Sequence, residues 1–238
     1  MASKAAAHWT KLSHGRIPQQ VGTFFEQITR QVTRGMAEDQ NIDFNAWSID
    51  SGIEVKGGDN THSFRIPSDQ LERHAALAEF PFSHVLYFLY RYDNRIGRES
   101  GTGLSKARGA TQRSLYLFRR MKDLVIIDHR ILRILAKKRY AVRSKALPMD
   151  PERECLILPS TELARYFSKD WNILLDGLGF EPADWQVNQR VIKLELKHGL
   201  EYHENMFPVR ALLPSALPFE RILKRPKCLR IRLPDLEL

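Results

Sequence analysis

The segment from residue 42 to residue 58 alternates apolar and polar side chains, which indicates a half-buried β-hairpin. We expect strands over residues 42–47 and 53–58, joined by a turn at Ser51-Gly52. One face of both strands must be buried, and this requirement fixes the register of the hairpin. The face expected to be buried carries Ile42, Phe44, Ala46, Ile53 and Val55. The opposite face carries Asp43, Asn45, Trp47, Glu54 and Lys56.

Three ionisable side chains, those of Asp43, Glu54 and Lys56, are therefore expected to meet on the polar face. Two carboxylates and an ammonium group held on a sheet suit a divalent cation and a water molecule. The same Glu-x-Lys alternation also occurs on solvated strand faces, where it forms only a weak surface ion pair. The hairpin alone leaves both interpretations open.

Composition is that of a globular protein, with 43% hydrophobic and 27% charged residues among 238. This length suffices for one large domain or two small ones. No apolar run is long enough to cross a bilayer. The two cysteines, Cys155 and Cys228, provide neither a disulfide framework nor a cysteine-based zinc site. We expect a soluble, cytoplasmic protein that does not bind membranes.

The positive charge is concentrated in the second half of the chain. Residues 1–95 contain 10 Lys and Arg against 11 Asp and Glu, whereas residues 96–238 contain 27 against 17. Within residues 98–145 there are 14 basic residues and three acidic ones. Such a concentration favours a polyanionic partner, since phosphate neutralisation supplies most non-specific affinity for nucleic acids. A solvated face of a basic protein is the alternative.

The hairpin lies within a regular succession of expected elements. An amphipathic helix is expected before it, a third strand after it, then a second helix with Ser68 as its N-cap, and a buried fourth strand. Their expected ranges are 22–34, 62–66, 68–79 and 85–92. Residues 93–109, with four glycines and several charges, are expected to be a linker or loop.

Residues 16–92 resemble the PD-(D/E)XK nuclease superfamily, the restriction-endonuclease-like fold, in both the order of elements and the motif. The resemblance implies an α/β protein with an αβββαβ core around a mixed sheet. It also implies a metal site formed by Asp43, Glu54 and the Val55 carbonyl, with Lys56 acting on the attacking water. Glu26 matches the acid that members often carry on the first helix, where it could help to bind a second ion. Gln70 matches a further active-site position of some branches.

Two departures from the family pattern are visible. Ile42 stands where the proline of the family name would be, although many members lack it. Asp50 competes with Asp43 for the aspartate role, but it falls in the expected turn, so Asp43 is preferred. His62 and His74 are expected to be surface residues without a role in the chemistry.

The resemblance implies a Mg²⁺-dependent DNA endonuclease, with Mn²⁺ as a possible substitute ion. A sequence-specific restriction enzyme of type II is the leading hypothesis, and a structure-specific, junction-resolving nuclease is the runner-up. A non-catalytic nucleic-acid-binding protein and an RNA substrate remain open alternatives. A palindromic site would favour a homodimer, but a monomer that nicks each strand in turn is equally compatible.

We expect two functional regions: a nuclease core over residues 1–97 and a basic DNA-binding or specificity region over residues 98–238. The second region is expected to be α+β, with a helix over 110–121, a helix or a strand and helix over 124–138, and strands over 191–197 and 228–233. Candidate phosphate contacts are Arg113, Arg119, Arg120, Arg130, Arg133, Lys137, Lys138 and Arg139.

Overall fold

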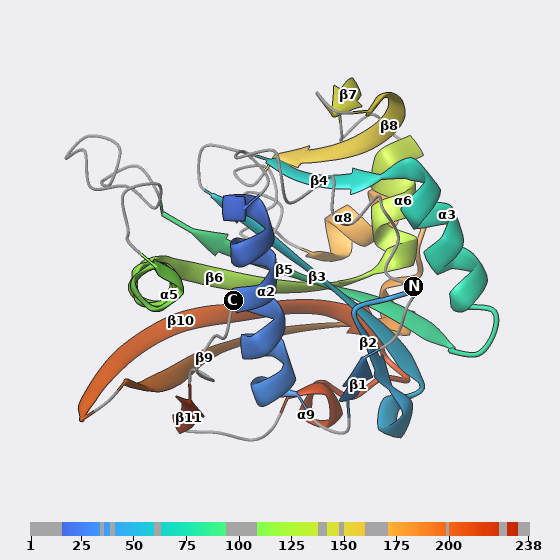
Figure 1. The fold of residues 1–238 in the computed structure, drawn as a ribbon. Helices are drawn as coiled ribbons and strands as arrows, with labels where there is room; N and C mark the ends of the chain where they lie inside the picture. Colours follow the sequence, from blue (N-terminus) through green and yellow to red (C-terminus); the bar gives the residue numbers. More distant parts are fainter. Residues whose placement is uncertain are drawn as a thin grey trace.

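A mixed eight-stranded sheet forms the centre of the computed structural model (Figure 1). The structure describes residues 16–33, 36–38, 41–59, 63–93, 109–137, 142–147, 150–159, 171–198, 200–223 and 228–232. In spatial order the strands are β1 (Met36–Glu38), β2 (Phe44–Ala46), β3 (Ser51–Asp59), β5 (His84–Tyr92), β6 (Met121–Asp128), β10 (Glu201–Pro214), β9 (Trp185–His198) and β11 (Cys228–Arg232). The pairs β3–β5, β6–β10 and β9–β11 are parallel, and the others are antiparallel. The protein is therefore of the α/β class.

A second, antiparallel sheet lies over one face of the large one (Figure 1). Its strands are β4 (Ser63–Pro67), β8 (Asp150–Pro159) and β7 (Val142–Leu147). The third strand of the expected core corresponds to β4, which pairs with β8 rather than with the hairpin. Of the strands of the expected core, the two hairpin strands and β5 lie in the large sheet, whereas β4 lies in the second sheet. The expected αβββαβ core is therefore divided between two sheets.

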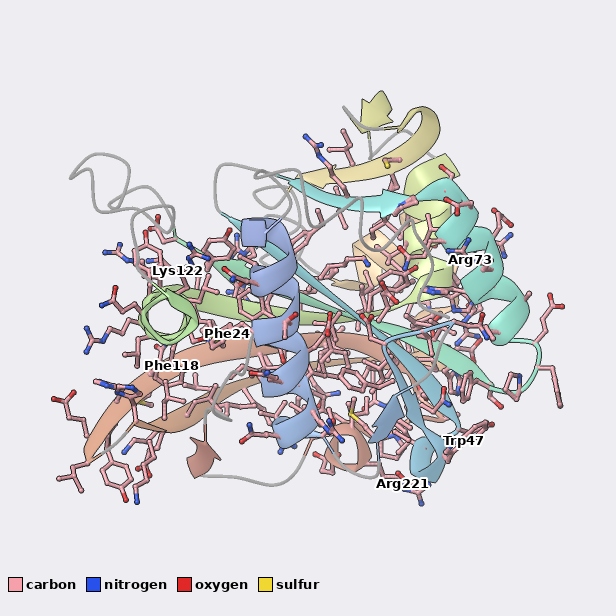
Figure 2. All side chains as sticks on the ribbon, in the orientation of Figure 1. Phe24, Trp47, Arg73, Phe118, Lys122 and Arg221 are labelled. Carbon is pink, nitrogen blue, oxygen red and sulfur yellow. The ribbon has the colours of Figure 1, made fainter. Side chains whose placement is uncertain are left out.

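Helices cover both faces of the large sheet and create two hydrophobic cores. One core includes apolar residues of α2 (Arg16–Val32), α5 (Gly109–Arg120) and α9 (Phe219–Ile222). The other includes residues of α3 (Ser68–Leu77), α6 (His129–Lys137) and α8 (Trp171–Leu178), together with β4 and β8. Strand β5 alternates between them, with Phe88 in the first core and Tyr87 in the second. Figure 2 marks Phe24 on α2 and Phe118 on α5, which belong to the first core.

The expected hairpin is present, but its turn lies earlier than predicted. A short 3₁₀ turn, η1 (Trp47–Ile49), is followed by Asp50 in the left-handed region at φ 50°, and β3 already begins at Ser51. Gly52 is needed inside the strand because a Cβ there would lie 2.6 Å from the Ile42 Cδ1 atom. The turn prediction at Ser51-Gly52 was therefore wrong by a few residues.

Two further local predictions were wrong. Ile42 belongs to the second core, opposite Phe44 and Ala46, because the chain bends over residues 41–43 before β2 begins. Ser68 is the first residue of α3, whose cap is Pro67 with no side-chain hydrogen bond.

The helix over 22–34 corresponds to α2, which begins earlier, at Arg16. The ambiguous segment over 124–138 is a strand followed by a helix, β6 and α6.

The large sheet continues across the expected boundary near residue 97, because β5 pairs with β6 in antiparallel register. The two predicted functional regions thus share one sheet, and their division of labour stays a prediction. Of the expected linker, Asp93 directly follows β5 and Gly109 begins α5, and residues 94–108 lie outside the described part. Among the helices described, none has the length and apolarity required to span a membrane.

Candidate active site

Asp43 is held by the strand that follows it in the hairpin. The β2–β3 ladder stops at the Phe44–Ile53 pair, so the next outward-facing N–H of β3 has no partner on β2. This group is the Val55 N–H, which donates instead to the Asp43 Oδ2 atom at 2.6 Å. The hydrogen bond fixes the direction of the Asp43 carboxylate, and it can form because β2 is too short to pair with Val55.

Glu54 is the buried centre of the cluster, with 2% of the residue exposed. It lies on the face of β3 that is covered by α3, and Gln70 Nε2 donates to its Oε1 atom at 2.6 Å. The Lys56 Nζ atom contacts the same oxygen as an ion pair. The Lys56 side chain is 26% exposed, so the partner of the buried carboxylate is itself accessible to solvent.

Glu54 lies close enough to Asp43 to disfavour the charged form of Asp43. The pKa of Asp43 is raised from 3.8 to about 7, chiefly by burial and then by the charge of Glu54. Lys56 and the Val55 N–H act in the opposite direction but do not compensate. Two acids that share a partly buried site with one lysine leave a net negative charge, which a cation would neutralise.

Glu26 has a weaker connection to the cluster. It lies on α2, which packs on the other face of the sheet, where Phe25 lies next to Gly57. Its charge raises the pKa of Asp43, as the smallest of five effects. The structure thus brings Asp43, Glu54, Lys56 and Gln70 together and leaves Glu26 at the periphery.

Asp50, the competing aspartate, lies away from Glu54 in the turn after η1. Its carboxylate accepts a hydrogen bond from Ser83 Oγ, and its backbone carbonyl accepts one from the Ser83 N–H at 3.1 Å. These bonds tie the hairpin turn to the loop before β5. Asp50 therefore has a structural role.

His74 is fully buried, so its prediction as a surface residue was wrong. Its Nδ1 atom is 2.7 Å from the Tyr87 hydroxyl, and its Nε2 atom is 3.7 Å from the Glu54 Oε2 atom. Burial lowers the pKa of His74 to about 4 in spite of Glu54, so the imidazole is neutral at pH 7. The sequence signal was the i, i+4 spacing from Gln70, which places both side chains on one face of α3. His62 lies outside the described residues.

A second buried carboxylate was missed altogether, that of Asp128 at the end of β6. Although burial alone would raise its pKa, the neighbouring side chains of His129, His84 and Arg130 hold the pKa well below the usual range. The Arg130 Nε atom lies 2.8 Å from Oδ1, and the Arg130 N–H donates to the same oxygen at 2.9 Å as the N-cap bond of α6. Asp128 is therefore a fully compensated structural anchor.

The candidate phosphate contacts differ in their surroundings. Arg130 is paired with Asp128, Arg133 with Glu72, and Arg113 donates to Gln20. Arg119 and Arg120 border a cavity described below. The Lys137 side chain is not described, and Lys138 and Arg139 lie outside the described residues.

The donor set fits a hard cation of the Mg²⁺ type. No group of three or more His, Cys, Asp or Glu side chains in the described ranges is arranged to hold a metal by itself. Mg²⁺ does not require one, because it is usually bound through one or two carboxylates, several waters and substrate phosphates. Asp43 and Glu54 would supply the two carboxylates, and the Val55 carbonyl stays a predicted ligand.

Comparison with known proteins identifies no relative of this chain. No family model, curated protein or solved structure matches the chain. The geometry of the site and the motif are therefore the basis on which a function is proposed.

Proposed function

We propose that the protein is a Mg²⁺-dependent DNA endonuclease that hydrolyses phosphodiester bonds. The observation that carries the proposal is the convergence of Asp43, Glu54, Lys56 and Gln70, which the bend before β2, strand β3 and helix α3 bring together. Two carboxylates beside one partly exposed lysine match the charge requirements of phosphodiester hydrolysis, which needs a cation, an oriented water and relief of phosphate charge.

Each residue has a distinct role in this proposal. Asp43 and Glu54 hold the ion, which when bound lowers the pKa of a coordinated water and screens the phosphate charge. Lys56, which is more accessible than Glu54, orients the attacking water or neutralises the charge that develops on the phosphate. Gln70 fixes the Glu54 carboxylate from α3, and His74 lies behind it as a neutral neighbour.

The basic second half supports DNA as the substrate. Residues 96–238 contain 27 Lys and Arg against 17 Asp and Glu, and β6 and β10 join this half to the sheet that carries the site. A positive surface continuous with the cutting site would hold the DNA backbone while the carboxylates act on one bond. The same chemistry serves a restriction enzyme and a junction-resolving nuclease.

The test is a cleavage assay with purified protein, plasmid DNA and branched DNA, in Mg²⁺ and in EDTA. The variants Asp43→Asn, Glu54→Gln and Lys56→Ala are expected to lose about 100-fold or more in rate. Asp50→Asn is the matched control, because asparagine tolerates the left-handed backbone and the residue lies outside the cluster. Discrete plasmid fragments favour the restriction type, and cleavage of branched DNA alone favours the junction-resolving type.

A non-catalytic nucleic-acid-binding protein would give a different pattern. It would bind DNA equally well with and without Lys56→Ala and would show no cleavage in Mg²⁺. That result would exclude the endonuclease proposal.

A further inference from the structure

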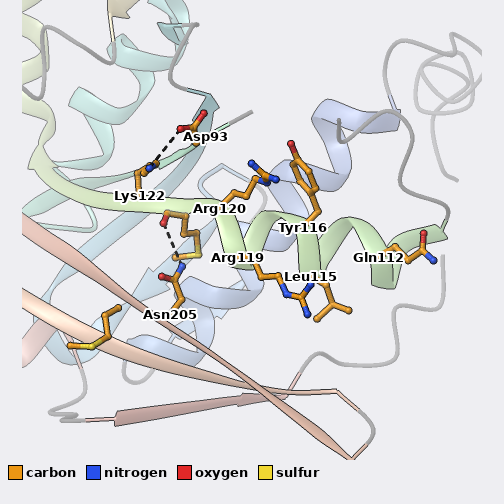
Figure 3. A pocket seen from close by; sticks show the side chains of 10 residues that line it. Asp93, Gln112, Leu115, Tyr116, Arg119, Arg120, Lys122 and Asn205 are labelled. Atoms are coloured by element: carbon orange, nitrogen blue, oxygen red, sulfur yellow. Dashed lines mark hydrogen bonds and ion pairs between the residues drawn. The ribbon is translucent and has the colours of Figure 1, made fainter. Parts of the chain in front are cut away.

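A cavity of about 810 Å³ lies at one end of the large sheet (Figure 3). Its walls come from α5, the start of β6 and β10. Helix α5 contributes Tyr116, Arg119 and Arg120, and the neighbouring strands contribute Lys122 and Asn205. Tyr87 lies opposite Glu54 in the sheet, and β5 leads from Tyr87 to Asp93 at the cavity. At about 3.3 Å per residue the cavity is about 20 Å from Glu54 along the strand.

The cavity has unbalanced positive charge. Lys122 Nζ lies 3.6 Å from an Asp93 carboxylate oxygen, but no carboxylate in the described part of the chain pairs with Arg119 or Arg120. Arg91, by contrast, is compensated by Asp123. Two guanidinium groups without carboxylate partners in a concave site are suited to bidentate contacts with phosphate oxygens.

The remaining lining favours a whole nucleotide over a bare anion. The Arg120 guanidinium stacks on the Tyr116 ring, 4.7 Å from its centroid, and forms a flat surface of the kind that nucleobases stack on. The Asn205 amide is fixed because its Nδ2 atom donates to the Phe118 carbonyl at 2.6 Å. Leu115 and Met206 add apolar surface, and the volume lies in the range of small-ligand sites.

We propose that this cavity binds an unpaired nucleotide of a DNA strand, with its phosphate on Arg119 and its base against the Arg120–Tyr116 pair. A nucleotide within a duplex is stacked and paired, so it cannot enter a concave site without leaving the helix. The cavity therefore selects a strand that is already single, at an end, gap or branch.

The position of the cavity gives it a role in choosing the substrate, and this role rests on the proposed endonuclease function. A separation of about 20 Å corresponds to about six nucleotides of a B-form strand. When a duplex is cut at Asp43 and Glu54, a single-stranded arm that begins a few nucleotides from the cut would reach the cavity. The inference thus favours structure-specific cleavage over sequence-specific restriction.

Binding is tested in EDTA, where cleavage plays no part. Fluorescence anisotropy would compare a blunt duplex with the same duplex carrying a single-stranded tail of ten nucleotides. The full-length protein is expected to bind the tailed duplex about tenfold more tightly, as one or two stacked bases would give. Replacing Arg119→Gln and Arg120→Gln together should reduce this preference to about twofold or less.

Arg221→Gln is the matched control, because Arg221 is an exposed arginine on α9, far from Lys122 (Figure 2). It should retain the preference for the tailed duplex. Arg119→Gln alone, at an exposed position, provides a second variant that leaves the fold unchanged. Equal affinity for the two duplexes, or a preference that survives in the double variant, would overturn the proposal. So would equal competition by a polyglutamate peptide, which would indicate a general polyanion surface.

The two proposals fail separately. If the tailed duplex is preferred in EDTA but no DNA is cut in Mg²⁺, the cavity is a binding site and the endonuclease function is wrong. If DNA is cut in Mg²⁺ without any preference for a tail, the endonuclease function stands and the cavity proposal is wrong.

Discussion

The clusters around Asp128 and Asp43 differ in how completely the charge of the aspartate is compensated. Asp128 is surrounded by His84, His129 and Arg130, and its pKa lies well below the usual range. Asp43 has Glu54 as its strongest charged neighbour, and its pKa is raised to about 7. A compensated carboxylate stabilises the fold, whereas an undercompensated one costs stability and keeps a place for a cation. We therefore infer a structural role for the first cluster and propose the second as the functional site.

The largest expected effect on stability is at the structural cluster. Asp128→Ala removes the acceptor of the Arg130 side chain and the N-cap bond of α6, and leaves the adjoining histidines without their carboxylate. We expect the free energy of unfolding to fall by about 3 kcal/mol or more, measured by urea denaturation at pH 7. A change below about 1 kcal/mol would show that Asp128 is not the anchor described.

Asp43→Asn is expected to act in the opposite direction, and its effect should depend on pH. Because the folded-state pKa is about 7 against 3.8, the folded protein retains a proton that the unfolded chain loses between these values. Metal-free wild type should therefore lose stability as the pH rises from about 4 to 7, and the variant should not. The variant should be the more stable protein at pH 8 and equal to wild type at pH 4, in thermal unfolding with EDTA. Wild type that is more stable than the variant at pH 8 would contradict the raised pKa.

Metal binding should reverse the ranking of these two proteins. Mg²⁺ at millimolar concentration should raise the melting temperature of the wild-type protein at pH 8, because an ion that binds only the folded state stabilises it. Asp43→Asn and Glu54→Gln should show little or no shift, and Asp50→Asn should behave as wild type. A shift of equal size in all four proteins would place the ion elsewhere.

The smallest expected effect is at Tyr87, which supports the site from β5. Tyr87→Phe removes the hydroxyl that lies 2.7 Å from His74 Nδ1 and leaves that buried nitrogen without its partner. We expect a loss of about 1 kcal/mol in the free energy of unfolding. The same substitution should lower the cleavage rate less than Gln70→Ala does, because Gln70 contacts Glu54 directly.

The sequence predicted the candidate site better than its surroundings. Glu54 and Lys56 follow from alternation along β3, and alternation is a local property of strands. Asp43 reaches the same site from the bend before β2, where it accepts the Val55 N–H, so strand alternation does not account for its position. The position of Ile42 did not follow, because a bend before β2 turns it into the other core. The pairing of β4 with β8 joins segments about 90 residues apart, and no local pattern encodes such a partner.

Burial of polar residues was the least predictable property. His74 lies in a helix rich in charged residues, where a surface position is expected. Only the packing of α3 on β5 places it beside Glu54. Asp128 follows a run of apolar residues, but its three partners come from the start of β5 and the start of α6. Tertiary contacts of this kind decide whether a charge is solvated or buried, and a single sequence does not contain them.

The central claim is that Asp43 and Glu54 converge around one cation, and a crystal soaked in Mn²⁺ tests it most directly. The anomalous difference map should contain a peak within about 2.2 Å of an oxygen of each carboxylate, and the peak should be missing in crystals of Asp43→Asn. A map without this peak, or carboxylates that diverge around no common centre, would contradict the account.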